Sequence, residues 1–118
     1  SVVETQDDEI ESYEQTSHLL KAHPEINALF FAAGGVYGGC RAVASLGLSG
    51  KLCAIAFDKA DTTEHFLKQG TLSAVICQQP RIQGARPLEL LFAYLTSGEL
   101  PEKEYNYTAV DIRILENI

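Results

Sequence analysis

The chain has 118 residues, of which 46% are hydrophobic and 21% charged, and its formal net charge is −7. This length is typical of one domain, and the composition is that of a globular protein rather than a disordered one. No apolar run reaches the roughly 20 residues that span a bilayer, so we expect no membrane partner. The acidic balance argues against a nucleic-acid-binding surface on this chain, because nucleic-acid phosphates would be repelled.

The N-terminal region predicts a short strand followed by a capped helix. Residues 2–5 are of strand type, and Asp7 or Asp8 can cap a helix that runs to about His23, before Pro24. One face of this helix carries apolar and small side chains at helical spacing, and we expect it to be buried: Ile10, Tyr13, Ser17 and Leu20.

The rest of the chain alternates between apolar runs and helical patterns. We expect strands at 26–33, 52–57, 72–77 and 105–115, and helices at 36–46, 60–69 and up to Ser97. This alternation predicts an α/β fold with a doubly wound, mostly parallel sheet flanked by helices. The nearly continuous apolar character of 26–33 is typical of a strand covered on both faces. Pro87 should either open the last helix or kink it.

Three of the predicted strands end on glycine or polar residues, and in open α/β sheets ligands bind at the carboxyl ends of the strands. Gly34 and Gly35 either let a helix pack closely or leave a bare turn that a ligand can approach. Asp58 is either a helix cap or an acceptor for ligand hydroxyl groups. Gln78 either faces a crevice or lies in a solvated turn. Each of these residues therefore has a structural and a functional interpretation.

The residues that could support catalysis or metal binding lack the necessary spacing. Cys40, Cys53 and Cys77 are odd in number and widely separated, which favours buried, reduced cysteines in a reducing compartment. A nucleophilic Cys40 is the alternative, but no histidine lies near it in the sequence. We therefore expect a protein that is not an enzyme and that uses no metal or cofactor.

Five motifs occur in a fixed order along the chain. They are HPEINALF at 23–30, AIAFD at 54–58, KQGTLSAV at 68–75, QQP at 78–80 with QG at 83–84, and DIRILENI at 111–118. In this order and with these gaps they resemble one lobe of the type I periplasmic-binding-protein fold. That fold occurs in LacI/GalR-family transcriptional regulators and in bacterial sugar-binding proteins. The resemblance covers essentially the whole chain and is to the C-terminal lobe.

The resemblance implies a lobe, residues 1–118, that closes with a second lobe on a small molecule. It implies that residues 79–104 cross toward that second lobe, which lies outside this chain. Asp58 matches an aspartate that hydrogen-bonds sugar hydroxyls, and Gln78 matches a glutamine at the hinge. An Asn-Asp pair is expected after the first parallel strand but is absent. We therefore expect backbone N–H groups of Gly34 and Gly35 to contact the ligand instead.

Among members of this fold, the sequence favours the effector-binding part of a LacI-family regulator. Such a protein would be a cytoplasmic homodimer that binds a carbohydrate effector and contacts DNA only through an N-terminal helix-turn-helix outside this chain. The unpaired cysteines favour the cytosol. The alternative is the solute-binding protein of a sugar transporter. A phosphoacceptor receiver domain would also explain Asp7, Asp8 and Asp58, but no lysine follows the strand that ends at Cys77.

Overall fold

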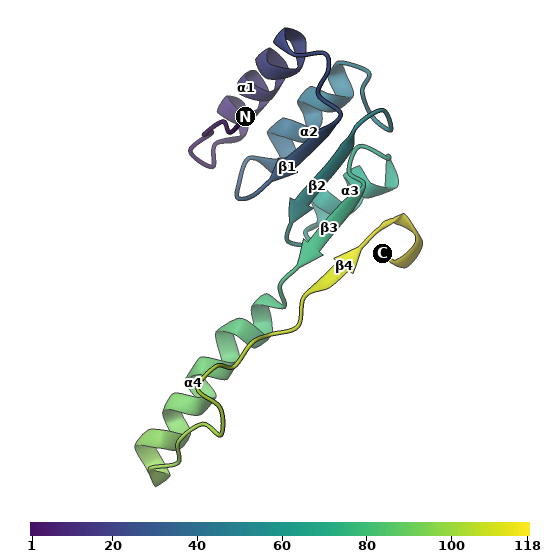
Figure 1. The fold of residues 1–118 in the computed structure, drawn as a ribbon. Coiled ribbons are helices and arrows are strands. Elements are labelled where there is room, and N and C mark those ends of the chain that lie inside the picture. Colours follow the sequence, from purple (N-terminus) through teal and green to yellow (C-terminus); the bar gives the residue numbers. More distant parts are fainter. The chain divides into compact units, whose positions relative to one another are not determined.

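The computed structural model describes all residues from Ser1 to Ile118. The chain forms two compact units. The first unit comprises residues 1–77 together with 112–118, and the second comprises residues 78–111. The elements in chain order are α1 (Glu9–Ala22), β1 (Ala28–Phe31), α2 (Val36–Ser45), β2 (Cys53–Phe57), α3 (Asp61–Lys68), β3 (Ala74–Cys77), α4 (Pro80–Ser97), β4 (Asp111–Arg113) and the short 3-10 helix η1 (Leu115–Asn117) (Figure 1).

The strands form one sheet in the order β1-β2-β3-β4, and the pairs β1–β2 and β2–β3 are parallel. Each step from one parallel strand to the next moves in the same direction across the sheet. Crossovers of one handedness then place their helices on one face, and α2 and α3 do lie on the same face of the sheet (Figure 1). The predicted mixed α/β fold with a mostly parallel sheet flanked by helices is confirmed.

The hydrophobic core lies between this sheet face and the helices. In β2 the buried residues Ala54 and Ala56 alternate with the half-buried Ile55 and Phe57, as the period of two in a strand requires. The core side chains that join the strands to the helices include Cys40, Val43, Phe66, Leu67 and Val75. The opposite face is less covered, since Phe30 is 57% exposed and contacts the Phe57 ring. The expectation that residues 26–33 are covered on both faces is therefore wrong for Phe30.

Two predicted strands differ from the observed structure. Residues 2–5 form no strand, because no neighbouring strand pairs with them and an unpaired strand is not stable alone. The last strand is limited to Asp111–Arg113 instead of spanning 105–115. It ends early because the Asn117 side chain accepts the Ile114 N–H at 2.8 Å and so folds the chain back into η1.

Helix α1 has nearly the predicted bounds, but of the face predicted to be buried only Leu20 is fully buried. Asp8 is its N-cap, and the buried residues are Ser12, Thr16 and Leu20, whereas Ile10 is 72% exposed. The reason is the close approach of α1 to α2. A Cβ on Gly38 would overlap the backbone carbonyl of Glu9, so only small side chains fit between the two helices. The expected close packing of a helix on the sheet is found one residue later, where a Cβ on Gly39 would overlap the Phe31 ring of β1.

Helix α4 belongs to the second unit and buries none of its side chains. Pro87 lies inside the helix, while Pro80 occupies its first turn and Gly98 ends it with a φ of 71°. An apolar stripe is exposed along the helix: Leu88, Leu91, Phe92 and Leu95. Neither α4 nor any shorter helix of the structure is long and apolar enough to cross a membrane.

Candidate functional site

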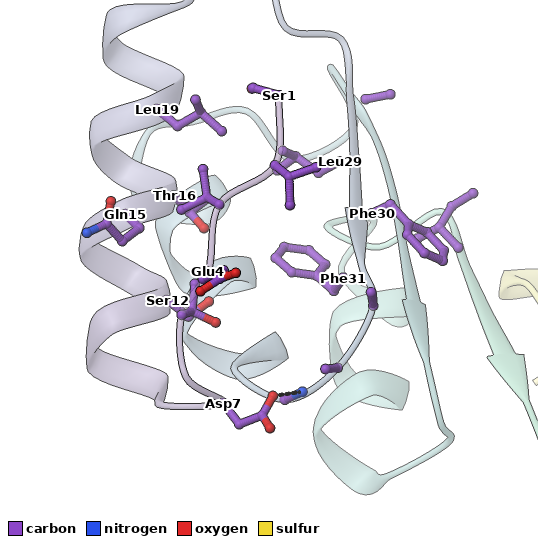
Figure 2. Close-up of a pocket in the computed structure, with 18 of the residues that line it drawn as sticks. Ser1, Glu4, Asp7, Ser12, Gln15, Thr16, Leu19, Leu29, Phe30 and Phe31 are labelled. Atoms are coloured by element: carbon purple, nitrogen blue, oxygen red, sulfur yellow. Dashed lines mark hydrogen bonds between the residues drawn. The ribbon is translucent and has the colours of Figure 1, made fainter.

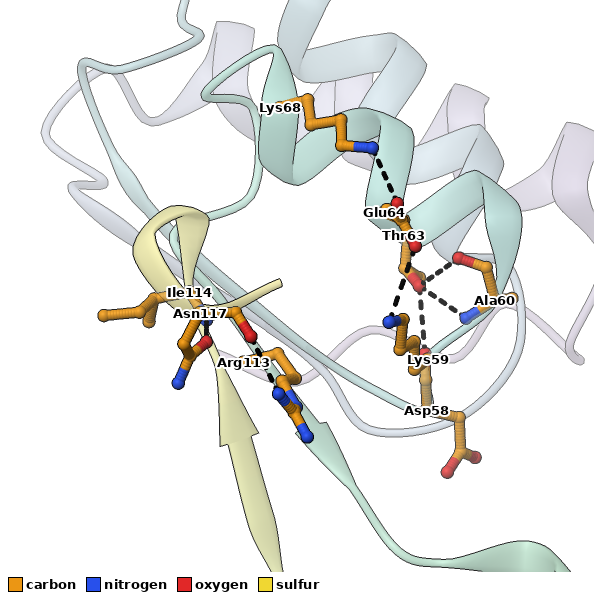
Figure 3. Close-up of polar contacts among 9 residues, drawn as sticks. All are labelled: Asp58, Lys59, Ala60, Thr63, Glu64, Lys68, Arg113, Ile114 and Asn117. Carbon is orange, nitrogen blue, oxygen red and sulfur yellow. Dashed lines mark hydrogen bonds and ion pairs between the residues drawn. The ribbon is translucent and has the colours of Figure 1, made fainter.

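Asp58 lies directly after β2 in the left-handed backbone region, with a φ of 65°. Its N–H donates to the Ile76 carbonyl at 2.8 Å, which extends the pairing of β2 with β3 by one residue. Its own carbonyl lies 3.1 Å from the Thr63 hydroxyl. The Asp58 backbone is thus held on two sides, whereas its exposed carboxylate has no protein partner and points away from Thr63 (Figure 3). The structure leaves this carboxylate open to a ligand.

The start of α3 shows that Asp58 is not the helix cap. The N-cap residue is Ala60, whose N–H donates to the Thr63 hydroxyl oxygen at 2.8 Å. Thr63 therefore satisfies the N-terminal donor that an Asp58 cap would have served. Of the two interpretations of Asp58, the structural one is not realised.

The basic residue next to Asp58 is engaged elsewhere. Lys59 lies 3.6 Å from the Glu64 carboxylate, and Lys68 approaches the same carboxylate at 2.6 Å (Figure 3). The hydrogen bond and charge of Lys68, with a smaller contribution from Lys59, lower the pKa of Glu64. Because Glu64 takes both ammonium groups, neither of them pairs with the Asp58 carboxylate.

Two carboxylates near the N-terminus accept hydrogen bonds from the turn after β1 and from the first turn of α2, which sequence reasoning did not anticipate. The Gly34 N–H donates to Asp7 at 2.7 Å (Figure 2), and the Gly38 N–H donates to Glu9 at 2.6 Å. Gly35 is buried and has a φ of 75°, a conformation that favours glycine. A sequence signal existed in the adjacent Asp7 and Asp8, because one helix start needs only one of them as its cap.

Gln78 is the first residue of the second unit and follows β3 directly. It is half-buried, and its backbone carbonyl accepts a hydrogen bond from the Gln83 side chain at 2.6 Å. Asp58 and Gly34 both belong to the first unit, at the carboxyl ends of the neighbouring parallel strands β2 and β1. The structure brings these two positions to one sheet edge, and the roles proposed for Asp58, Gln78, Gly34 and Gly35 stay predictions.

A cavity of about 770 Å³ lies beside β1. Its walls are residues 1–7, one side of α1 and residues 28–34, with Cys53 and Ile55 from β2 (Figure 2). It includes Gly34, but it does not include Asp58, Gly35 or Gln78. The cavity and the Asp58 carboxylate are therefore separate features of the first unit.

The cysteines do not provide a reactive nucleophile next to the glycine turn. All three are free, and Cys40 lies on the buried side of α2 and is fully buried. Burial, and secondarily the charge of Glu9, raises the pKa of the Cys40 thiol to about 12. The nucleophilic form is the thiolate, so Cys40 is inert near neutral pH.

We expect iodoacetamide to modify the exposed Cys53 of the native protein at neutral pH and to leave Cys40 unmodified, as read by mass spectrometry. Both cysteines should react after unfolding in urea, which is the control. Because burial raises the Cys40 pKa from 9.0 to about 12, we also expect the free energy of unfolding to fall as pH rises from 9.0 toward about 12. Equal alkylation of both thiols in the native protein would contradict the structure.

Comparison with known protein families gives a match over most of the chain. Residues 1–100 match the family described as periplasmic binding protein domain. The chain belongs to this family. A comparison with curated proteins returned no match.

Solved structures of sugar-binding and solute-binding proteins resemble this family member closely. An ABC transporter solute-binding protein from Agrobacterium vitis with bound D-fucose is 30% identical, with a TM-score of 0.89 over 99% of this chain and 40% of that one. A sugar ABC transporter sugar-binding protein from Bacillus halodurans is 26% identical, with a TM-score of 0.83 over 96% of this chain and 42% of that one. The glucose-galactose binding protein GanP from Geobacillus stearothermophilus is 22% identical, with a TM-score of 0.86 over 98% of this chain and 41% of that one.

This periplasmic-binding-protein domain thus spans about two fifths of the length of the structures it matches. Those structures are named as sugar-binding or solute-binding proteins and not as enzymes. The free carboxylate of Asp58 at the end of β2 suits non-covalent recognition of hydroxyl groups. No group of three or more potential ligand residues is placed to hold a metal ion.

Proposed function

We propose that the chain is one lobe of a two-lobed protein that binds a sugar or a sugar-like small molecule. The observation that carries this proposal is Asp58, an exposed carboxylate without a protein partner that stands at the carboxyl end of β2. Its left-handed backbone is held by Ile76 and Thr63, so the site is formed before a ligand arrives. The similar structure with bound D-fucose, and a further one in complex with D-arabinose, support the ligand class.

The second lobe is part of the same proposal. Residues 79–104 would cross toward it, and the exposed apolar stripe of α4 supports this assignment. Contiguous exposed apolar surface of this kind marks an interaction site on a soluble protein. A helix of 18 residues that buries no side chain gains its stability from packing that this chain does not supply.

Two kinds of whole protein fit such a lobe. The structures of ABC-transporter binding proteins favour the solute-binding protein of a sugar transporter. The three free cysteines favour a reducing compartment, and hence a cytoplasmic, dimeric LacI-family regulator with a DNA-binding headpiece outside this chain. The coding sequence upstream of Ser1 discriminates between them, because the regulator requires a helix-turn-helix there and the transporter protein a signal peptide.

The sugar-binding proposal is tested by thermal unfolding of the full-length protein. We expect D-fucose, D-arabinose, D-glucose or D-galactose to raise the melting temperature, because a ligand that binds only the native state stabilises it. At 100 times the dissociation constant the gain is about 2.7 kcal/mol. If none of these sugars moves the melting curve, and a wider panel of polyols also leaves it unchanged, the proposal is wrong.

A further inference from the structure

The turn at the end of β1 is connected to a side chain far away in the sequence. The Gly34 N–H donates to the Asp7 carboxylate, 27 residues earlier in the sequence (Figure 2). A Cβ on Gly34 would lie 2.8 Å from the Asp7 Cβ, so this approach requires glycine. Asp7 and Gly34 also both line the cavity beside β1. The contact therefore determines where the turn lies relative to the N-terminal segment.

Asp7 itself is held in place by the backbone around it. Gln6 and Asp7 have left-handed φ angles of 51° and 57°, and the Asp8 N–H donates to the Thr5 carbonyl at 2.9 Å. Asp8 then caps α1 by accepting the N–H groups of the helix start. The adjacent aspartates thus have different partners: Asp8 holds the helix, and Asp7 holds the turn.

The carboxylates of Asp7 and Glu9 place negative charge beside the start of α2. Asp7 and Glu9 take the N–H groups of Gly34 and Gly38, and the N–H groups of Val36 and Tyr37 between them have no acceptor in the structure. A ligand hydroxyl can accept from these donors and donate to a carboxylate oxygen. An anionic ligand group would lie near two negative charges, which repel it.

We propose that Asp7 positions the Gly34–Gly35 turn for ligand binding and selects an uncharged ligand over an anionic one. This inference rests on the proposed sugar-binding function and deepens it, because it excludes sugar acids from the ligand class. Asp7 acts through the turn by a hydrogen bond and on the ligand by its charge. These two effects can be separated by substitution.

Two variants separate the effects, and they are compared in the full-length protein. Asp7→Ala removes both the acceptor and the charge. Because alanine is strained at a φ of 57°, Asp7→Gly, which removes both without that strain, is measured beside it and should show the same changes. Asp7→Asn keeps an oxygen acceptor for the Gly34 N–H and removes only the charge. Glu14→Gln is the matched control, because it removes the same charge from an exposed residue of α1 that makes no contact with the turn.

The first measurement needs no ligand. We expect the Gly34 amide to exchange with solvent roughly two- to tenfold faster in Asp7→Ala, in line with the loss of one hydrogen bond. The exchange rate should stay at the wild-type value in Asp7→Asn and in Glu14→Gln. An unchanged rate in Asp7→Ala overturns the positioning role, whatever the protein binds.

The second measurement compares D-galactose with D-galacturonate, which differ only in the acid group at carbon 6, by calorimetry. We expect Asp7→Ala to bind D-galactose roughly two- to tenfold more weakly than wild type. Asp7→Asn should bind D-galactose normally and D-galacturonate about tenfold more tightly than wild type. If wild type binds sugars and Asp7→Asn leaves this preference unchanged, the selectivity role is wrong while the proposed function stands. If wild type binds no sugar, the proposed function and the selectivity role both fail, and amide exchange still decides the positioning role.

Discussion

Replacing Asp58 by asparagine is expected to weaken sugar binding by the full-length protein roughly 10- to 100-fold, which is the effect of losing a hydrogen bond to a charged group. The melting temperature without ligand should stay close to that of wild type, because the Asp58 carboxylate contacts no protein group. Calorimetry with D-fucose or D-galactose measures the first effect, and thermal unfolding measures the second.

Asparagine is the better substitution because of the backbone at this position. The φ of 65° is tolerated by Asn and Asp, whereas alanine would add roughly 1–2 kcal/mol of left-handed strain. Asp61→Asn is the matched control, since Asp61 is an exposed acid in the first turn of α3. Normal sugar binding by Asp58→Asn would show that the ligand site lies elsewhere.

The largest expected effect on stability comes from Gly38→Ala. The new Cβ would overlap the Glu9 backbone carbonyl and lie 3.1 Å from the Tyr13 nitrogen, so backbone atoms of α1 would have to move. Overpacking of a tight interface costs roughly 1–3 kcal/mol, and we expect the upper part of that range because no flexible side chain can give way. Chemical unfolding monitored by circular dichroism measures this loss.

The same substitution at Gly84 is the control and should act in the opposite direction. Gly84 lies inside α4, has no positive φ, and has no atom within 4 Å of a built Cβ. Alanine there is expected to stabilise the helix by up to about 1 kcal/mol, because it forms helices better than glycine. A loss of stability at both positions, or at neither, would contradict the packing of α1 on α2.

The element order could be predicted from the sequence because it follows from local patterns. Apolar runs of four to eight residues alternate with amphipathic segments, and Pro24, Gly70 and Gly98 stand where helices end. The exceptions are residues 2–5 and 105–110, which have strand composition but no strand structure. Strand composition is not sufficient, because a strand exists only when a neighbour pairs with its backbone.

The candidate site could be predicted only in part. Asp58 and Gln78 were chosen as candidates because they follow apolar strands directly, and the structure places them after β2 and β3. The Asp7–Gly34 contact could not be found, because it joins residues that no local pattern connects. The helix-cap interpretation of Asp58 is excluded only by the tertiary structure, because the Thr63 hydroxyl accepts the Ala60 N–H at the start of α3.

The sequence by itself determined that this chain is an α/β lobe with polar residues and glycines at the ends of its parallel strands, because strand and helix periodicities and strand ends are local properties. Only the tertiary structure decided which face of α1 is buried and which partner each acidic residue near the N-terminus takes. Helical spacing favoured Ile10, but the glycines of α2 admit only small side chains such as Ser12. The tertiary structure also left the Asp58 carboxylate free while it engaged the carboxylates of Asp7 and Glu9. These outcomes depend on contacts between distant segments, where close approach and unsatisfied backbone donors outweigh local preference.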